Sequence, residues 1–379
     1  MSDGGPSFSL GIEEEYLLVD RKTRDLAHDR PDAFMTALEA KLGEQVKPEF
    51  LTSQVELVTR PCADIAAARA ELKQLRRTAA AVAGEFGLAI VAAATHPFAG
   101  YESTTPTDKE RYKILARDLQ GVGRRLLICG MHVHCALDDN ELRIDLMSQI
   151  AYFLPHILAL STSSPFWRGE DTGLKSYRIA VFDELPRTGI PEQFDSWGEY
   201  QRHVDILVKT GLIEDASKLW WDVRPSARFP TLEMRITDVP TLMEDTLTIA
   251  ALYVCILRML WRLKRANQRW RRYAAMLIGE NRWRAQRYGI DEGLVDFGKG
   301  EIVPYAHLLG ELVELTREDA AALGCAADVA RAPEIILRGT SAHRQRKTYA
   351  LARAAGADKR EALTKVVDAL IAETVADVV

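Results

Sequence analysis

Ionisable residues recur on one face of four strand-like segments, and no other feature of the sequence constrains the fold as strongly. Apolar residues alternate with other types in residues 8–19 (FSLGIEEEYLLV), 52–59 (TSQVELVT), 126–137 (LLICGMHVHCAL) and 231–238 (TLEMRITD). Because successive side chains of a strand point to opposite faces, each segment can bury one face and hold its charged groups on the other. The segments therefore predict a sheet with an apolar face toward the core and a polar face that carries ionisable groups.

The ionisable face combines carboxylates with imidazoles. Its residues are Glu13 and Glu15 on the first segment, Glu56 on the second with Glu49 ahead of it, His132 and His134 on the third, and Glu233 and Arg235 on the fourth. Two carboxylates about 4 Å apart repel by roughly 4 kcal/mol at an effective dielectric constant near 20, so a crowd of them needs a neutralising cation. Oxygen ligands with few nitrogens and no thiolate suit Mg²⁺ or Mn²⁺ better than Zn²⁺. If the strands are neighbours, the pattern predicts a site for one of these two metals.

Each piece of this pattern also has a simpler explanation. The Glu-Glu-Glu triplet at 13–15 is typical of a solvated strand edge, and an H-x-H pair is as often structural as metal-binding. Glu56 and Glu233 stand among apolar neighbours, where a glutamate is more often salt-bridged than catalytic. The recurrence on four separate segments is what favours a metal site over these alternatives.

The rest of the chain reads as helices and loops around these strands. We expect helices at 32–42, 64–86, 142–161, 242–289 and 359–378, a further strand at 88–94, and irregular segments at 101–124 and 163–178. The segment 101–124 contains Pro106, Gly121 and Gly123, which predicts an exposed, mobile connection. Strands separated by varied loops and helices indicate an α+β fold with an antiparallel sheet. No linker is evident, so we expect a single domain over residues 1–379 with a helical C-terminal part at 300–379.

Charge and cysteine content exclude several classes of protein. The chain has 54 acidic and 49 basic residues and a net charge of −5, whereas non-specific nucleic-acid binding needs a basic excess. The five cysteines show no C-x-x-C spacing, which argues against a disulfide framework or a zinc ribbon and favours a reduced, cytoplasmic compartment. The N-terminus lacks the features of a signal peptide. The longest apolar run, Leu247–Leu260, predicts a buried helix and not a membrane span.

Six stretches of the sequence resemble the glutamate–cysteine ligase type 2 family of carboxylate–amine ligases. They are GIEEEYLLVD, VELVTRP, GMHVHC, LSTSSPFWRGEDTGLKSYR, WDVRPSARFPTLEMRITDVPT and ENRWRAQRYG, and the resemblance runs from residue 8 to about 290. It implies the fold that glutamate–cysteine ligases share with glutamine synthetase, in which a curved, mainly antiparallel sheet forms a funnel with helices packed outside. It also implies ATP and Mg²⁺ (or Mn²⁺) as cofactors, in a single catalytic domain.

The resemblance also implies roles for individual residues. Its metal ligands are Glu13, Glu15, Glu49, Glu56, His132 and Glu233, with Glu49 matching an acidic position ahead of the second strand. Arg235 matches the residue that meets the transferred phosphate, so the implied catalytic residues are Arg235, Glu13 and Glu233.

Five further residues are candidates for contacts with the cofactor or the substrate. Asn281 and Arg284, in a basic helical stretch, are candidates for the nucleotide's phosphates, together with Arg235. Arg168, Arg178 and Arg224 are candidates for a substrate carboxylate, because arginine binds carboxylates in a bidentate fashion. Structural roles in their loops are an equal alternative.

The reaction implied by the resemblance joins the γ-carboxylate of glutamate to an amine through an acyl phosphate, with cysteine as a weak acceptor or another amine in its place. No G-x-x-x-x-G-K-[ST] or G-x-G-x-x-G motif occurs, so ATP binding rests on the resemblance. Two alternatives stay open: a zinc-dependent metallohydrolase that uses His132, His134 and the carboxylates, and a non-catalytic protein that binds a nucleotide or an amino acid. We expect small-molecule partners, no nucleic acid and no membrane, and we consider a homodimer through the tryptophan-bearing helices.

Overall fold

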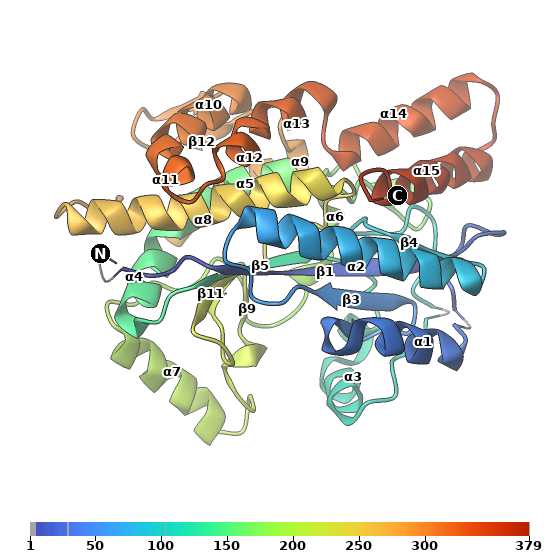
Figure 1. Ribbon diagram of the computed structural model, residues 1–379, viewed down its shortest axis with the longest axis horizontal. Helices are drawn as coiled ribbons and strands as arrows, with labels where there is room; N and C mark the ends of the chain where they lie inside the picture. The colour runs from blue at the N-terminus through green and yellow to red at the C-terminus, as the bar shows by residue number, and fades with distance from the viewer. Residues whose placement is uncertain (1–4, 29, 103, 379) are drawn as a thin grey trace.

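The computed structural model describes residues 5–28, 30–102 and 104–378, and an antiparallel sheet lies at its centre (Figure 1). Within these residues the sheet has seven strands in the order β10-β11-β5-β1-β3-β2, and β4 pairs with β1 beyond the end of β5. The strands are β1 Leu10–Asp20, β2 Val46–Pro48, β3 Gln54–Val58, β4 Leu88–Val91, β5 Met131–Ala136, β10 Val223–Pro225 and β11 Thr231–Met234. Every pair in this sheet is antiparallel, and the sheet is not closed into a barrel, so the predicted α+β class is confirmed.

Helices surround the sheet and cover its core face. α2 packs on β1 and β4, α8 packs on β5, and α15 packs on β4. In Figure 1, α10 and α11 lie above α8, whereas α1, α3 and α7 lie below the sheet. The helices are α1 Asp32–Leu42, α2 Ile65–Glu85, α3 Glu110–Gly123, α4 Asn140–Ile150, α5 Leu154–Ser161, α6 Tyr177–Phe182, α7 Trp197–Lys209, α8 Met243–Arg265, α9 Ala275–Tyr288, α10 Tyr305–Leu315, α11 Arg317–Ala322, α12 Ala326–Ala330, α13 Ala332–Arg338, α14 Ser341–Ala354 and α15 Lys359–Thr374.

Three small two-stranded sheets stand outside the main one. They pair β6 Phe166–Trp167 with β7 Glu170–Asp171, β8 Thr188–Gly189 with β9 Trp220–Trp221, and β12 Leu294–Asp296 with β13 Glu301–Val303. The first lies within the segment 163–178, which the sequence predicts to be irregular and which ends in the first two residues of α6.

The central strand β1 directs its three consecutive glutamates to two faces. Glu14 points into the core. Its Oε1 lies 2.6 Å from Arg76 Nη2 and 2.7 Å from the Thr246 hydroxyl. Its Oε2 accepts a hydrogen bond from the Tyr16 hydroxyl. The side chains of Glu14 and Arg76 are both fully buried. Arg76 also donates to the carbonyl of Thr241 at 2.8 Å. This ion pair joins β1 to α2, α8 and the chain before α8, and Glu13 and Glu15 are left on the opposite face.

Two sequence predictions about helices are wrong. The segment 101–124 is not merely a connection, because 110–123 forms α3, and Tyr112 is buried with its hydroxyl 2.8 Å from the Pro48 carbonyl. The glycines at its end accompany a break at Gln120, whose φ is 48°, and do not prevent the helix.

The segment 242–289 is not one helix, because α8 ends at Arg265 and α9 begins at Ala275. Asn267, with a φ of 56°, lies in the turn between them.

In the part of the chain that the structure describes, two helical stretches are long and apolar enough to cross a membrane, Asn140–Ser161 and Met243–Arg265. Their most apolar windows are 89% and 78% buried inside the fold, respectively. The run Leu247–Leu260 is therefore a buried helix, as predicted.

Replacing Arg76 with methionine should destabilise the protein by about 3–5 kcal/mol, because it leaves the Glu14 carboxylate buried without its cation. Urea unfolding followed by circular dichroism measures this change. Adding Glu14→Gln to the same chain should recover part of the loss. The control is Arg60→Met, since Arg60 forms an ion pair with Glu71 but its side chain is 66% exposed, and the loss of so exposed a pair should cost far less than the loss of Arg76. Equal losses for the two single variants would contradict the role given to the buried pair.

Candidate active site

The register of the strands brings the predicted carboxylates and imidazoles into a row across the polar face. Glu15 lies opposite Glu56 in the β1–β3 pair, and Glu13 lies opposite His132 in the β1–β5 pair. Glu233 lies opposite His134 in the β5–β11 pair. Directly opposed residues have Cβ atoms roughly 5 Å apart, so four strands, each placed by its own apolar face, deliver these groups to one place.

These side chains line a cavity of about 440 Å³. Its polar lining includes all six predicted metal ligands, together with His134, Lys47, Arg178, Arg224 and Arg235. Its apolar lining includes residues of one small hydrophobic cluster: Leu119, Leu126, Ile128, Phe182, Leu185 and Trp220. The cavity therefore combines a strongly charged wall with an apolar one.

Three overlapping sets of side chains can each hold a metal ion. Their ligand atoms lie within 4.8 Å of one another in the sets Glu13–Glu56–His132, Glu13–His134–Glu233 and Glu15–Glu49–Glu56. Glu13 and Glu56 each belong to two sets. Oxygen atoms outnumber nitrogens in every set, which is the ligand chemistry that Mg²⁺ and Mn²⁺ prefer.

The imidazole of His132 fits such an ion. Its Nδ1 lies 3.2 Å from Glu13 Oε2, while its buried Nε2 has no hydrogen-bond partner among the described residues and lies 3.9 Å from Glu15 Oε1. Burial, and then the charge of Arg235, lower the pKa of His132 to about 4. The ring is therefore neutral at neutral pH, which is the state in which histidine binds a metal.

The carboxylates divide into two electrostatic groups, and in the first group hydrogen bonds or arginine charges offset burial. Burial acts to raise the pKa of Glu13, but hydrogen bonds with His132 and His134 outweigh it and hold that pKa well below its usual value. Burial likewise opposes ionisation of Glu233, but the charges of Arg235 and Arg224 hold its pKa well below the usual range. Both carboxylates are thus stabilised in their charged form.

The second group lacks this compensation. Burial raises the pKa of Glu56 well above its usual value, and the neighbouring charges of Glu13 and Glu49 add to the shift. Burial also raises the pKa of Glu15, against the partial opposition of Arg178. The set Glu15–Glu49–Glu56 is therefore the part of the site that needs an additional positive charge most.

Arg235 and Arg224 both pair with Glu233. Arg224 Nε lies 3.1 Å from Glu233 Oε2, and Arg235 Nη1 donates to the other carboxylate oxygen. The buried Nε of Arg235 has no hydrogen-bond partner among the described residues. Arg235 lines the cavity, and its contact with the transferred phosphate stays a prediction.

Arg178 is held behind the carboxylates by close packing. It is 2% exposed, donates to the carbonyls of Ile236 and Arg235 at 3.3 and 3.2 Å, and keeps an unpartnered Nε within the described part of the chain. A Cβ at Gly130 would lie 2.4 Å from Arg178 Nη2, so a larger residue at that position would have to displace the guanidinium.

Three predicted site residues lie outside this cavity. Arg168 forms an exposed ion pair with Glu102 and lines a neighbouring cavity. Asn281 exchanges two hydrogen bonds with the backbone of Val295, at 2.8 and 2.7 Å, and Arg284 Nε donates to the carbonyl of Gly293 at 2.9 Å. Asn281 and Arg284 thus anchor β12 and the turn before it, and their predicted contact with a nucleotide stays a prediction.

Lys47 is a site residue that the sequence did not reveal. Its Nζ lies 3.5 Å from Glu56 Oε2 and 3.9 Å from Glu13 Oε1. It belongs to β2, a three-residue strand that ends at Pro48 and pairs Lys47 opposite Glu56. A strand this short carries too little alternation to be recognised, so only the pairing with β3 identifies Lys47.

Comparison with known families and proteins agrees with this site. The family model described as glutamate-cysteine ligase family 2 (GCS2) matches residues 9–369. A protein of Rhodospirillum rubrum named "Putative glutamate--cysteine ligase 2" is 61% identical over 375 residues, covering 98% of this chain and 96% of its own. A protein of the same name from Jannaschia sp. is 57% identical over 364 residues, covering 96% of each chain.

Solved structures share the fold at low sequence identity. Glutamate–cysteine ligase from Francisella tularensis, in complex with AMP, has a TM-score of 0.69 and 14% identity, over 97% of this chain and 88% of its own. A bifunctional glutathione synthetase from Pasteurella multocida has a TM-score of 0.64 and 15% identity, over 97% of this chain but 53% of its own, so this chain spans about half of that protein. The predicted fold relationship is therefore confirmed. Because the family model covers most of its length and the close relatives cover nearly all of it, the chain belongs to glutamate–cysteine ligase family 2, a family of ligases.

Proposed function

We propose that this protein is an ATP- and Mg²⁺-dependent carboxylate–amine ligase that activates the γ-carboxylate of glutamate as an acyl phosphate. An amine then displaces phosphate to form an amide, with cysteine as a weak acceptor or another amine in its place. The observation that carries the proposal is the cavity in which three overlapping metal-ligand sets lie beside Arg235 and an apolar wall. Family membership supports the same reaction class.

The carboxylate sets fit divalent cations. Glu13, Glu56 and His132 would hold one ion, and the sets completed by Glu233 and by Glu15 would hold others. Bound ions supply charge neutralisation for phosphate oxygens, which is the main requirement of phosphoryl transfer. Mn²⁺ would serve the same ligands.

The two walls of the cavity suit the two ends of a nucleotide. The apolar cluster around Phe182 and Trp220 offers a surface for a base, whereas Arg235 offers a cationic donor for the transferred phosphoryl group. An AMP complex of a structural neighbour supports nucleotide binding on this fold. The chain then needs no Gly-rich phosphate loop.

Arg178 and Arg224 are the candidates for the acid substrate within the cavity. Each guanidinium is largely buried beside the carboxylate row, and Arg178 keeps an unpartnered Nε. They would orient the amino acid so that a γ-carboxylate oxygen attacks the γ-phosphorus, ADP departs, and the amine then attacks the acyl carbon while phosphate departs. Positioning of this kind accounts for much of the rate enhancement in group transfer. A zinc hydrolase on His132 and His134 is less favoured, since carboxylate oxygens dominate every ligand set.

Replacing Glu56 with glutamine should reduce activity by about 10²–10³-fold without unfolding the chain, because two of the ligand sets lose a charged oxygen. The assay incubates protein, ATP, Mg²⁺ and glutamate with hydroxylamine and measures hydroxamate and ADP. The matched control is Glu85→Gln, an exposed glutamate that pairs with Lys41, and it should keep wild-type activity. Retained activity in Glu56→Gln would remove Glu56 from the site, and absence of both products in the wild type would count against the ligase proposal.

When divalent cations are chelated, the ionisation of Glu56 and Glu15 should lower the free energy of unfolding as the pH rises. Since the pKa of Glu56 and the pKa of Glu15 are raised in the folded state, the folded protein binds more protons than the unfolded chain. Each shifted group then lowers stability by up to about 1.4 kcal/mol per pH unit between its unfolded pKa and its raised folded pKa. Thermal unfolding in EDTA between pH 5 and about 8, compared between the wild type and Glu56→Gln, measures this slope, because the lowered pKa of His132 acts in the opposite sense in both proteins and cancels in the comparison. Excess Mg²⁺ should flatten the slope, and Glu56→Gln should reduce it. A slope unaffected by either change would contradict the proposed repulsion.

A further inference from the structure

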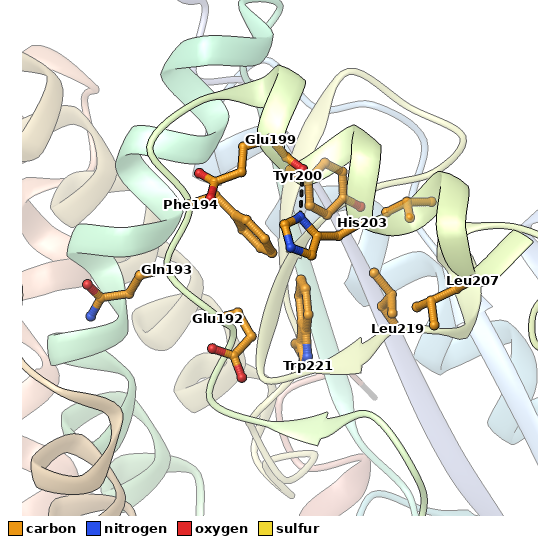
Figure 2. Close-up of a pocket in the computed structure, with 10 residues that line it drawn as sticks. Glu192, Gln193, Phe194, Glu199, Tyr200, His203, Leu207, Leu219 and Trp221 are labelled. Carbon is orange, nitrogen blue, oxygen red and sulfur yellow. Dashed lines mark hydrogen bonds between the residues drawn. The ribbon is translucent and has the colours of Figure 1, made fainter.

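A second cavity lies on the other side of β9 from the ligase cavity. It has a volume of about 310 Å³ and is enclosed by α7, the chain before it and β9 (Figure 2). Trp220 lines the ligase cavity, whereas the next residue, Trp221, lines this one. The proposed ligase reaction makes no use of it.

Most of its wall is aromatic or aliphatic. The ring of Phe194 lies 5.6 Å from that of Tyr200 and 6.0 Å from that of Trp221, measured between centroids. Figure 2 shows the aliphatic side chains of Leu207 and Leu219 across the cavity from the glutamates. A ligand with an apolar body can therefore contact both walls.

The ionisable groups that line this cavity are two carboxylates, the Tyr200 hydroxyl and the imidazole of His203, whose Nδ1 donates to the Glu199 carbonyl at 2.8 Å. Of its ten lining residues, all in the described part of the chain, Glu192 and Glu199 are the acids and none is lysine or arginine. Burial raises the pKa of Tyr200 to about 12, so its hydroxyl adds no charge at neutral pH. Glu192 is exposed and has no hydrogen bond or ion pair within the described residues, and Glu199 Oε2 accepts one bond, from the Asp195 backbone at 2.8 Å. The cavity therefore presents negative charge beside aromatic faces.

The rim of the cavity is fixed in place by contacts outside it. Gln193 Nε2 donates to the Tyr273 carbonyl at 2.7 Å, and Asp195 pairs with Arg272 at 3.0 Å. The amide of Trp197 donates to Glu141 Oε2 at 3.0 Å. The loop before α7 is thus tied both to α4 and to the chain before α9, and the cavity is formed before any ligand arrives.

We propose that this cavity binds a small organic cation, namely a protonated or quaternary amine with an apolar or aromatic body. An anion would be repelled by the two carboxylates, and a neutral ligand would leave them without a counterion. A cation can place its charge between Glu192 and the indole face of Trp221, where the ring quadrupole attracts it. The volume is at the lower end of the range of about 300–1,000 Å³ for ligand sites, which restricts the ligand to a small one. This binding goes beyond the proposed ligase function and does not depend on it.

Isothermal titration of the full chain tests the proposal with three matched probes: phenethylammonium, 2-phenylethanol and 3-phenylpropanoate. Saturating Mg²⁺ is present, so that the carboxylates of the ligase cavity do not compete for the amine. Only the cation should bind saturably, at one site. Glu192→Gln should weaken binding about two- to fivefold, the range of one exposed ion pair. Trp221→Leu should weaken it by a similar factor through the lost cation–π contact.

Two control variants separate this site from general effects. Glu214→Gln removes an exposed glutamate from the chain between α7 and β9, and Glu214 does not line the cavity. Ile206→Ala changes the exposed face of α7. Both should bind phenethylammonium as the wild type does. The proposal is overturned if no probe binds saturably, if the alcohol binds as tightly as the ammonium, or if Glu192→Gln has no larger effect than Glu214→Gln. It is also overturned if Glu56→Gln abolishes binding while Glu192→Gln does not, because the amine would then occupy the ligase cavity.

Discussion

The buried ion pair between Glu14 and Arg76 sets the register on which the whole site depends. A strand that slips by one residue exchanges its two faces, and in β1 such a slip would place Glu13 and Glu15 in the core and Glu14 in the cavity. The guanidinium that meets β1 in the core belongs to Arg76, which already donates to the carbonyls of Pro240 and Thr241. The observed register is therefore the one that gives Glu14 its buried cation, and it places Glu13 opposite His132 and Glu15 opposite Glu56.

The carboxylates on the polar face of the sheet differ in how far neighbouring groups offset the cost of burying their charge. This difference shows where the site needs a cation. At one end the histidines and two arginines compensate Glu13 and Glu233, whereas at the other end Glu15 and Glu56 are raised in pKa by burial, with like charges adding to the shift. Lys47 is 41% exposed and offsets part of the charge on Glu56. A site that accumulates uncompensated carboxylate charge inside a cavity is suited to divalent cations, and the apolar wall beside it completes a surface for a nucleotide.

The sequence predicted the site better than it predicted the surrounding helices, for physical reasons. Alternation determines which face a strand residue occupies, so Glu13, Glu56 and Glu233 could be assigned to one polar face before their strands were paired. Alternation says nothing about the order of strands, and the position of Lys47 follows only from the pairing of β2 with β3. Asn281 was predicted from its place in a basic helix, but its amide is used to hold the backbone of Val295. The terminal glycines of α3 predict a loop, but they follow a break at Gln120 near the end of the helix and leave its earlier turns intact.

The central claim is that bound divalent cations share Glu13 and Glu56. Anomalous diffraction from crystals grown with Mn²⁺ and a non-hydrolysable ATP analogue measures this directly. The account predicts manganese peaks in contact with both carboxylates, with the analogue's phosphates beside Arg235. Manganese peaks elsewhere on the molecule, with the carboxylate row devoid of metal in the presence of the bound analogue, would contradict it.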